Sequence, residues 1–172
     1  MLRHWPRSDY HDDMTHPATF DIDALLKQCQ IGRSRCSGPG GQHRNKVETA
    51  VLITHTATGV TGSASERRSQ ADNRRVALFR LRLNLALEVR SPKESTPSGR
   101  FRVPVNSEHD DFPAVLAAAL DAVDHHAYDV KAAAGQLGCS MSQLLKLLNA
   151  DPRALKQVNV QRQQRDLRPL RR

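Results

Sequence analysis

The chain is poor in cysteine, and its few cysteines are not spaced for a disulfide or metal framework. Among 172 residues it has three, Cys29, Cys36 and Cys139, an odd number with no C-x-x-C pair. Small disulfide scaffolds and structural zinc sites need paired or closely spaced cysteines. We therefore expect no disulfide framework, no bound metal and no cofactor, and we expect a reducing compartment.

Long apolar runs are also missing. The sequence nowhere reaches the roughly 18 uncharged apolar residues that a membrane span requires, and its N-terminal stretch lacks the apolar region of a signal peptide. These absences argue against export and against membrane insertion. We expect a cytoplasmic protein.

Positive charge is abundant and unevenly placed. The formal net charge is +8; residues 31–90 hold 11 Lys and Arg against 4 Asp and Glu, and residues 151–172 hold 7 against 2. The rest of the chain is mildly acidic. Segregated basic blocks are typical of proteins that bind a polyanion, most often nucleic acid.

Composition and periodicity divide the chain into five parts. We expect a flexible N-terminal arm at 1–19, a first domain at 20–90, a linker at 91–112 that is rich in proline, a small helical module at 113–150 and a basic C-terminal tail at 151–172.

Local signals predict the elements within these parts. A helix capped by Asp21 or Asp23 precedes a strand near Ile31, and residues 47–54 alternate in the two-residue period of a strand that ends in a turn at Gly59. A helix begins after Ser69. Its apolar stripe is Val76, Phe79, Leu83 and Leu87, with Arg82 off the stripe where it could face phosphate; later helices have Asp129 and Ser140 as N-caps and Gly138 in the turn between them.

The stretch SGPGGQHRNK, residues 37–46, separates two predicted strands. It matches neither phosphate-binding glycine pattern, and a strand rather than a helix follows it. Gly40 and Gly41 would let the backbone approach a reacting group closely, and the Gln42 N–H could donate to a developing oxyanion. An amide side chain cannot act as a general base, so such a site would position water and stabilise charge.

Several short motifs surround this loop in a fixed order. They are Arg35, Ser37-Gly38, Gly40-Gly41-Gln42, His43, Asn45-Lys46, Thr54-His55, Thr58-Gly59, Arg68-Ser69-Gln70 and Asn73-Arg74. Together they resemble the catalytic domain of the class I peptide-chain release factors, and more closely the short relatives that rescue stalled ribosomes. The resemblance covers roughly residues 20–90 and departs at Cys36, Arg44 and Ala64-Ser65. It implies an α+β fold, a small mixed sheet with packed helices, followed here by a small all-α module.

The resemblance also implies a reaction. Gly40, Gly41 and Gln42 would be the catalytic triplet, entering the peptidyl-transferase centre of the large ribosomal subunit, where the ester that joins peptide to P-site tRNA is hydrolysed. The Gln42 backbone N–H would stabilise the transition state, its side chain would admit water, and the terminal hydroxyl of the tRNA would handle protons. The implied contacts to ribosomal RNA are His43, Arg44, Asn45 and Lys46, with Arg35, Arg67 and Arg68 added on charge alone. Whether a methyltransferase modifies Gln42, as in relatives, stays open, and we expect a monomer.

The C-terminal half suggests how the protein would recognise a stalled ribosome. Short rescue factors end in a basic tail that enters the empty messenger channel, which makes Arg162, Arg165, Arg168, Arg171 and Arg172 candidate RNA contacts. Factors that read stop codons carry further domains before the catalytic one, whereas about 20 residues precede it here. We therefore expect release that is independent of a codon.

Two alternatives stay open. The first is release on split large subunits, which would not require the tail. The second is a non-catalytic protein that binds ribosomal RNA or DNA through the helix-turn-helix-like module. Against DNA reading, the second helix of that motif, at residues 140–150, offers only Lys146 as a cation.

Overall fold

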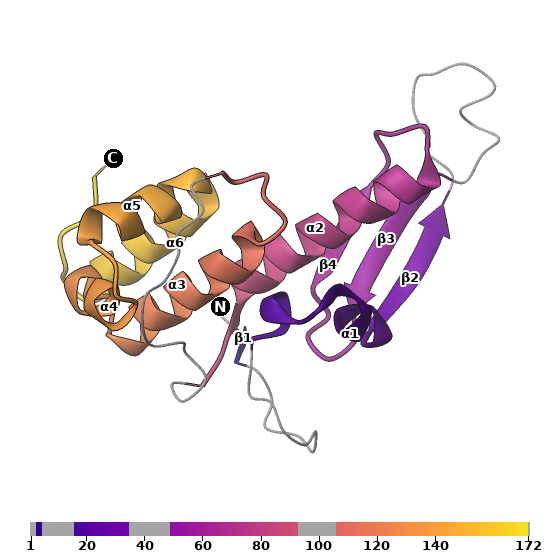
Figure 1. Ribbon diagram of the computed structural model, residues 1–172. Helices are drawn as coiled ribbons and strands as arrows, with labels where there is room; N and C mark the ends of the chain where they lie inside the picture. The colour runs from indigo at the N-terminus through magenta and orange to yellow at the C-terminus, as the bar shows by residue number, and fades with distance from the viewer. Residues whose placement is uncertain (1–2, 5–15, 35–48, 93–105, 172) are drawn as a thin grey trace.

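The computed structural model describes residues 3–4, 16–34, 49–92 and 106–171, although for 3, 4 and 34 only the backbone. An α+β fold results, with a small sheet at one end and a layer of helices at the other (Figure 1). The elements are β1 (Arg3–His4), the 3-10 helix η1 (Pro17–Thr19), α1 (Ile22–Lys27), β2 (Cys29–Ser34), β3 (Ala50–His55), β4 (Thr61–Ala64), α2 (Gln70–Glu88), β5 (Val89–Arg90), α3 (Phe112–His125), α4 (Val130–Gln136), α5 (Met141–Ala150) and α6 (Pro152–Gln163).

The sheet is antiparallel, in the order β2-β3-β4. Along β3 the side chains of Val51, Ile53 and His55 are buried against α2, whereas Leu52 is exposed on the opposite face. This alternation confirms the predicted strand, and the turn after it contains Gly59 at a φ of 69°. The small sheet therefore presents one face to the core and leaves the other open.

Gly62 lets β4 lie directly on α2. A Cβ atom at this position would stand 2.2 Å from the Ala77 carbonyl oxygen and 2.3 Å from the Leu81 nitrogen, far inside van der Waals contact. Because both of these atoms belong to the helix backbone, no side-chain movement could make room. The sheet and the long helix are thus fixed to each other by backbone proximity.

Helix α2 begins where the sequence predicts, with the Ser69 hydroxyl accepting a hydrogen bond from the Asp72 N–H at 3.3 Å. Its buried face differs from the predicted stripe. Of that stripe only Leu87 is buried, because α2 is covered by the sheet on one side and by α3 on the other. The residues of α2 that are buried are Asn73, Ala77, Leu78, Leu81, Arg82, Leu85, Ala86 and Leu87.

The prediction that Arg82 could face phosphate is wrong. Its side chain is 8% exposed and donates to two backbone carbonyls, that of Ala18 at 3.2 Å and that of Asp110 at 2.8 Å. The guanidinium therefore connects η1 and the segment before α3 to the middle of the molecule. Burial beside these carbonyls leaves it no path to a nucleic acid.

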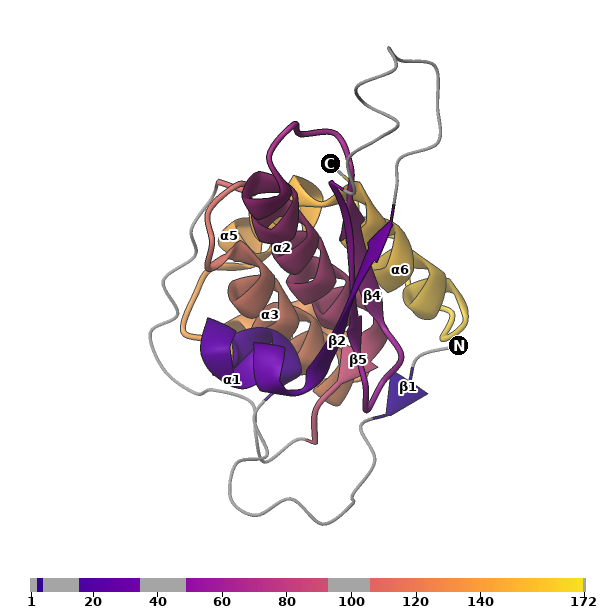
Figure 2. The same ribbon diagram turned by 90° about the vertical axis from the view of Figure 1, so that its right-hand side faces the viewer.

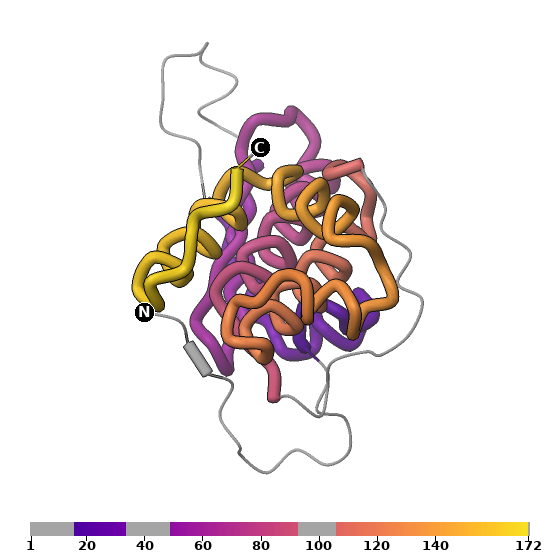
Figure 3. Tube along the Cα trace, turned by 90° about the vertical axis from the view of Figure 1, so that its left-hand side faces the viewer, coloured from indigo at the N-terminus to yellow at the C-terminus, as the bar shows by residue number. Residues whose placement is uncertain are grey.

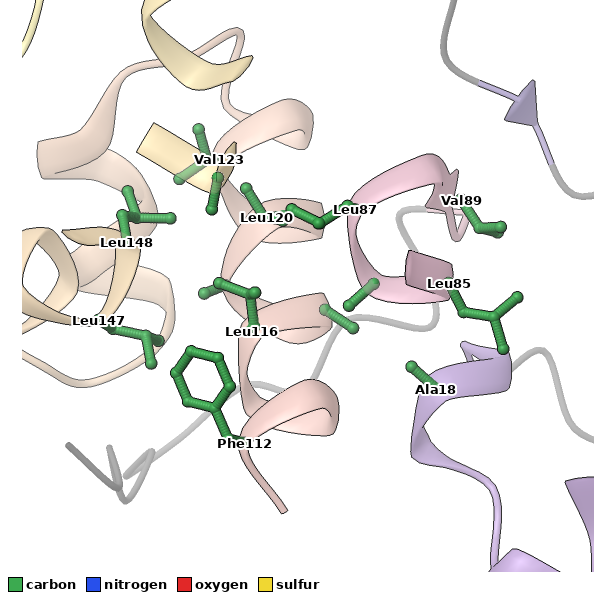
Figure 4. Close-up of a cluster of buried hydrophobic side chains, with 14 of the residues drawn as sticks. Ala18, Leu85, Leu87, Val89, Phe112, Leu116, Leu120, Val123, Leu147 and Leu148 are labelled. Carbon is green, nitrogen blue, oxygen red and sulfur yellow. The ribbon is translucent and has the colours of Figure 1, made fainter. Parts of the chain in front are cut away.

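The helical module shares the core of the first domain. The side chains of Leu116 and Leu120 on α3 lie between Leu87 of α2 and the leucines of α5 (Figure 4). The predicted caps are confirmed: Asp129 caps α4, Ser140 caps α5 in a capping box with Gln143, and Gly138 has a φ of 63°. Figure 3 looks onto this layer of helices. Most of the predicted linker, 93–105, lies outside the described residues.

The last residues of the predicted N-terminal arm pack into the core. His16, Pro17 and Ala18 are buried, and the His16 ring accepts the Ala18 N–H at Nδ1 (3.0 Å) while its Nε2 lies 3.2 Å from the Val89 carbonyl oxygen. Further upstream, β1 pairs in parallel with β5 (Figure 2). Buried apolar contacts and paired backbone groups, which the irregular sequence of the arm does not reveal, hold these residues.

Among the described residues, the longest helices are too polar or too short to cross a lipid bilayer.

Candidate functional site

The segment that carries the predicted catalytic triplet starts and ends at one end of the sheet. Ser34, the last residue of β2, pairs with Ala50, the first residue of β3. Residues 35–49 connect these two, so the chain leaves and rejoins the sheet across a single pair of strands. This end of the sheet lies beside the N-terminal end of α2 (Figure 1).

Most of the predicted site falls within that segment, outside the described residues. The residues concerned are Gly40, Gly41 and Gln42 of the triplet and the predicted RNA contacts Arg35, His43, Arg44, Asn45 and Lys46. Their roles stay predictions. What the structure gives is the frame from which the segment projects and the charges around that frame.

Asn73 is the centre of this frame. Its side chain is fully buried, and its Nδ2 donates to the carbonyl oxygens of Thr49 (2.7 Å) and Arg67 (3.0 Å), while its Oδ1 accepts the Arg67 N–H at 2.9 Å. One amide thus connects three separate stretches: the start of β3, the turn before α2 and the first turn of α2. All of these bonds go to backbone groups, so they fix positions in the main chain.

The signal for Asn73 was present in the sequence. Asparagine favours caps and turns over helix interiors because its amide competes for backbone groups. An asparagine four residues after the N-cap Ser69 is therefore unusual, and it predicts a tertiary hydrogen-bond role. The motif order that includes Arg68-Ser69-Gln70 and Asn73 indicates the family, and the hydrogen bonds of Asn73 give the motif its structural role.

Exposed arginines surround the same end of the molecule. The predicted RNA contacts Arg67 and Arg68 are exposed, and Arg74 and Arg75 on α2 and Arg33 near the end of β2 are exposed as well. Of the acids nearby, Glu66 forms an ion pair with Arg80 at 2.7 Å. Hydrogen bonding by the Ser65 N–H, and then by Arg80, lowers the pKa of Glu66. The surface around the segment therefore carries an excess of positive charge.

The motifs Thr54-His55 and Thr58-Gly59 lie at the other end of β3. The buried His55 ring contacts the Thr58 hydroxyl at 2.8 Å and the Gln28 side-chain oxygen at 3.2 Å, which joins the β3–β4 turn to the start of β2. Burial lowers the pKa of this ring, favouring the neutral form. These motifs stabilise the sheet and lie away from the segment 35–48.

The C-terminal basic residues do not form an extended tail. Residues 152–163 form α6, whose Ala154 and Val158 are buried. After the helix the chain folds back: Asn159 exchanges two hydrogen bonds with the Leu170 backbone, at 2.7 and 3.1 Å. The structure differs from the predicted tail because Ala154 and Val158 give α6 a buried apolar face. Two apolar residues are too few for the sequence to indicate such a face.

Two of the predicted RNA contacts in this region have partners within the protein. Arg162 donates to the Tyr128 and Arg168 carbonyls, and the Arg165 guanidinium lies 4.5 Å from the centroid of the Tyr128 ring. Arg168 and Arg171 are exposed, and Arg172 lies outside the described residues. This second basic region lies near the C-terminal end of α2, whereas the paired ends of β2 and β3 lie beside its N-terminal end (Figure 1).

A groove separates α6 from the ends of α2 and α3. Its volume is about 1060 Å³, and its lining contains both signs of charge: Arg153, Lys156 and Arg165 with Glu88 and Asp124. Neither sign dominates. Within the described ranges no group of three or more His, Cys, Asp or Glu side chains could hold a metal ion.

Comparison with known proteins identifies the family. The RF-1 domain family model matches residues 18–108, just over half of the chain. Peptide chain release factor 2 of Lactiplantibacillus plantarum is 45% identical over 67 residues, which are 39% of this chain and 18% of that protein. Peptide chain release factor 1 of Chloroherpeton thalassium is 46% identical over 66 residues, covering 38% of this chain and 18% of that protein.

A further relative extends the match. Peptide chain release factor 1 of Rickettsia prowazekii is 41% identical over 88 residues, 51% of this chain and 25% of that protein. The similarity thus spans about a fifth to a quarter of the length of these relatives. No solved structure shows a significant match. With the family match running through the sheet, the segment 35–48 and α2, the chain belongs to the RF-1 domain family, the family of the class I peptide chain release factors.

Proposed function

We propose that this protein hydrolyses peptidyl-tRNA on the ribosome without reading a stop codon, and so rescues stalled ribosomes. The observation that carries the proposal is the family match over residues 18–108, which includes Gly40-Gly41-Gln42. The described residues on either side of the segment 35–48 support it: the paired ends of β2 and β3, the hydrogen bond from the Asn73 amide to Thr49, and a cluster of exposed arginines.

The proposed reaction uses backbone rather than acid–base side chains. Water attacks the carbonyl carbon of the ester, and the Gln42 N–H donates to the oxygen on which negative charge develops. The ester bond to the tRNA then breaks, and a proton of the water passes by way of the terminal hydroxyl of the tRNA to the departing oxygen. The peptide is left as a carboxylic acid and the tRNA with both of its terminal hydroxyls free. The Gln42 amide orients the water, which it can do as donor and acceptor without exchanging protons.

The exposed arginines near the segment would contact ribosomal RNA. Phosphate contacts fix the position of a protein on nucleic acid, which here would hold the triplet in the peptidyl-transferase centre. Arg67 and Arg68 are the predicted contacts, and Arg74 and Arg75 extend the same surface. A partner of this kind explains why the basic residues gather at the end of the sheet.

Independence from a stop codon is the finer part of the proposal. It is supported by the resemblance to short rescue factors and by the second basic region beyond α6, where Arg168 and Arg171 are exposed. If this region binds RNA in the empty messenger channel, replacing Arg168, Arg171 and Arg172 by Gln will reduce release from intact stalled ribosomes. Unchanged release from intact ribosomes would favour action on split large subunits instead.

The proposal is tested by release of labelled peptide from ribosomes stalled on truncated messenger. We expect the protein to release peptide and Gly41→Ala to reduce the rate at saturating protein by about 100-fold or more, because a Cβ obstructs the approach of the backbone donor. Gln42→Ala should also reduce it. Lys131→Ala, at an exposed position on α4, is the matched control and should leave the rate unchanged.

Failure of release would point to the non-catalytic alternative. Tight ribosome binding with no release by the unaltered protein would mean that the segment serves as an RNA contact only. Binding to duplex DNA that survives Gly41→Ala would instead favour the helical module as the functional part.

A further inference from the structure

The buried amide of Asn73 makes more backbone contacts than stability of the helix start requires. Ser69 already caps α2 through its hydroxyl, and Asp72 supplies an acidic side chain in the first turn. The side chain of Asn73 adds nothing to that cap. Its three side-chain hydrogen bonds all leave the helix and end on Thr49 and Arg67.

Thr49 is the residue at which the chain returns from the segment 35–48 to the sheet. Its carbonyl oxygen lies 2.7 Å from Asn73 Nδ2, the shortest of the three bonds. Beyond Thr49 the strand is held by pairing on both sides, to β2 and to β4. The Asn73 bond therefore extends the fixed part of the main chain by one residue, to Thr49, at the C-terminal end of the segment.

The second anchor of Asn73 lies among the exposed cations. Arg67 gives both of its backbone groups to the amide, through its N–H at 2.9 Å and its carbonyl at 3.0 Å. The turn that carries Arg67 and Arg68 is thereby held at a set position relative to Thr49. Because Asn73 holds both Arg67 and Thr49, it also fixes the distance between the arginines proposed to bind RNA and the residue at which the segment rejoins the sheet.

We propose that Asn73 is a positioning residue for peptide release: it holds the return of the segment 35–48 and the arginine turn in one rigid frame. The inference rests on the proposed function. Two bound surfaces act together only if the spacing between them is fixed, and a misplacement of about 1 Å can cost about 100-fold in rate. Asn73 contacts neither RNA nor substrate, so it acts through Thr49 and Arg67.

The chain offers a matched control on the same helix. Asn84 also donates its amide to a backbone carbonyl of the sheet, that of Thr61 at 2.8 Å, and it lies nearer the other end of α2. Asn73→Ala and Asn84→Ala each remove a side-chain bond between α2 and the sheet. Only the first removes the bond to Thr49.

Asn73→Ala leaves buried groups unpaired and will lower stability, so stability has to be controlled as well. Val158→Ala truncates a buried side chain of α6, remote from the segment, and serves as a destabilised reference. Asn73→Ser is a milder variant, whose shorter hydroxyl cannot reach both carbonyls. All variants are compared at a temperature at which circular dichroism shows each of them folded.

Release from stalled ribosomes is then measured over a range of protein concentrations. We expect the maximal rate of Asn73→Ala, and of Asn73→Ser if the first does not fold, to fall about tenfold or more. The half-saturating concentration should change less than about twofold, because the cations themselves remain. Asn84→Ala and Val158→Ala should keep the maximal rate.

The outcomes separate this inference from the proposed function. Release by the unaltered protein with an unchanged maximal rate in both Asn73 variants would overturn the positioning role alone. Equal loss of rate in Val158→Ala would also overturn it, because general destabilisation would then be sufficient. No release by the unaltered protein would overturn the proposed function, and the positioning role in release with it.

Discussion

At the scale of single residues, the His16 ring is held in its neutral form by burial. Desolvation lowers its pKa from 6.5 to about 4, and the Ala18 N–H occupies Nδ1, which a proton would need. The unfolded ring binds a proton below about pH 6.5, whereas the folded ring does so only near pH 4. Stability contributed by the neutral ring is therefore present above pH 6.5 and is lost as the pH falls from about 6.5 to about 4.

Urea unfolding at several pH values tests this. At about 1.4 kcal/mol for each unit of pKa difference, the free energy of unfolding should fall by roughly 3 kcal/mol across this range because of His16. Asp121, whose pKa burial raises to about 6, changes stability in the opposite direction over part of it. The comparison is therefore with His16→Asn, which keeps an acceptor for the Ala18 N–H but does not titrate. Equal pH dependence in both proteins would contradict the assignment.

At the scale of elements, Asn159 docks the end of the chain on α6, and this raises the question whether the arginines beyond α6 bind RNA in the docked or in an undocked form. Asn159→Ala removes both hydrogen bonds to Leu170, with a net cost of about 1 kcal/mol. If the exposed arginines beyond α6 bind RNA in an undocked form, affinity for stalled ribosomes should rise by up to about fivefold. Lower affinity in a filter-binding assay would mean that RNA binds the docked form. Ser142→Ala on the exposed side of α5 is the control.

At the scale of the whole molecule, two basic regions lie near opposite ends of α2. The elements that carry them share one hydrophobic core, which fixes the distance between the two regions. The arginines around the segment 35–48 lie at one end and those beyond α6 at the other (Figure 1). Ribosome binding should weaken steeply with salt, because each phosphate contact releases counterions. Replacing Arg67 and Arg68 together by Gln should lower the slope of log affinity against log salt by about one to two. An unchanged slope would place the RNA surface elsewhere, and replacing the exposed Lys131 and Lys146 together by Gln controls for the loss of two charges.

The sequence by itself determined the local elements and the identity of the loop. Alternation in β3, the caps Ser69, Asp129 and Ser140, and the turn glycines are local signals, because each depends on residues a few positions apart. The motif order around Gly40-Gly41-Gln42 gave the family for the same reason. How that segment is placed stays a prediction.

Tertiary structure alone decided which faces are buried and what holds the site's frame. Arg82 reads as a phosphate contact in sequence, yet η1 and the segment before α3 cover it. The partner of the His16 ring, Val89, lies 73 positions along the chain, and that of Asn159, Leu170, lies 11 positions along it. Asn73 bonds to Thr49, which lies 24 positions before it. Such contacts depend on how elements pack, and packing between distant stretches leaves no periodic trace in a single sequence.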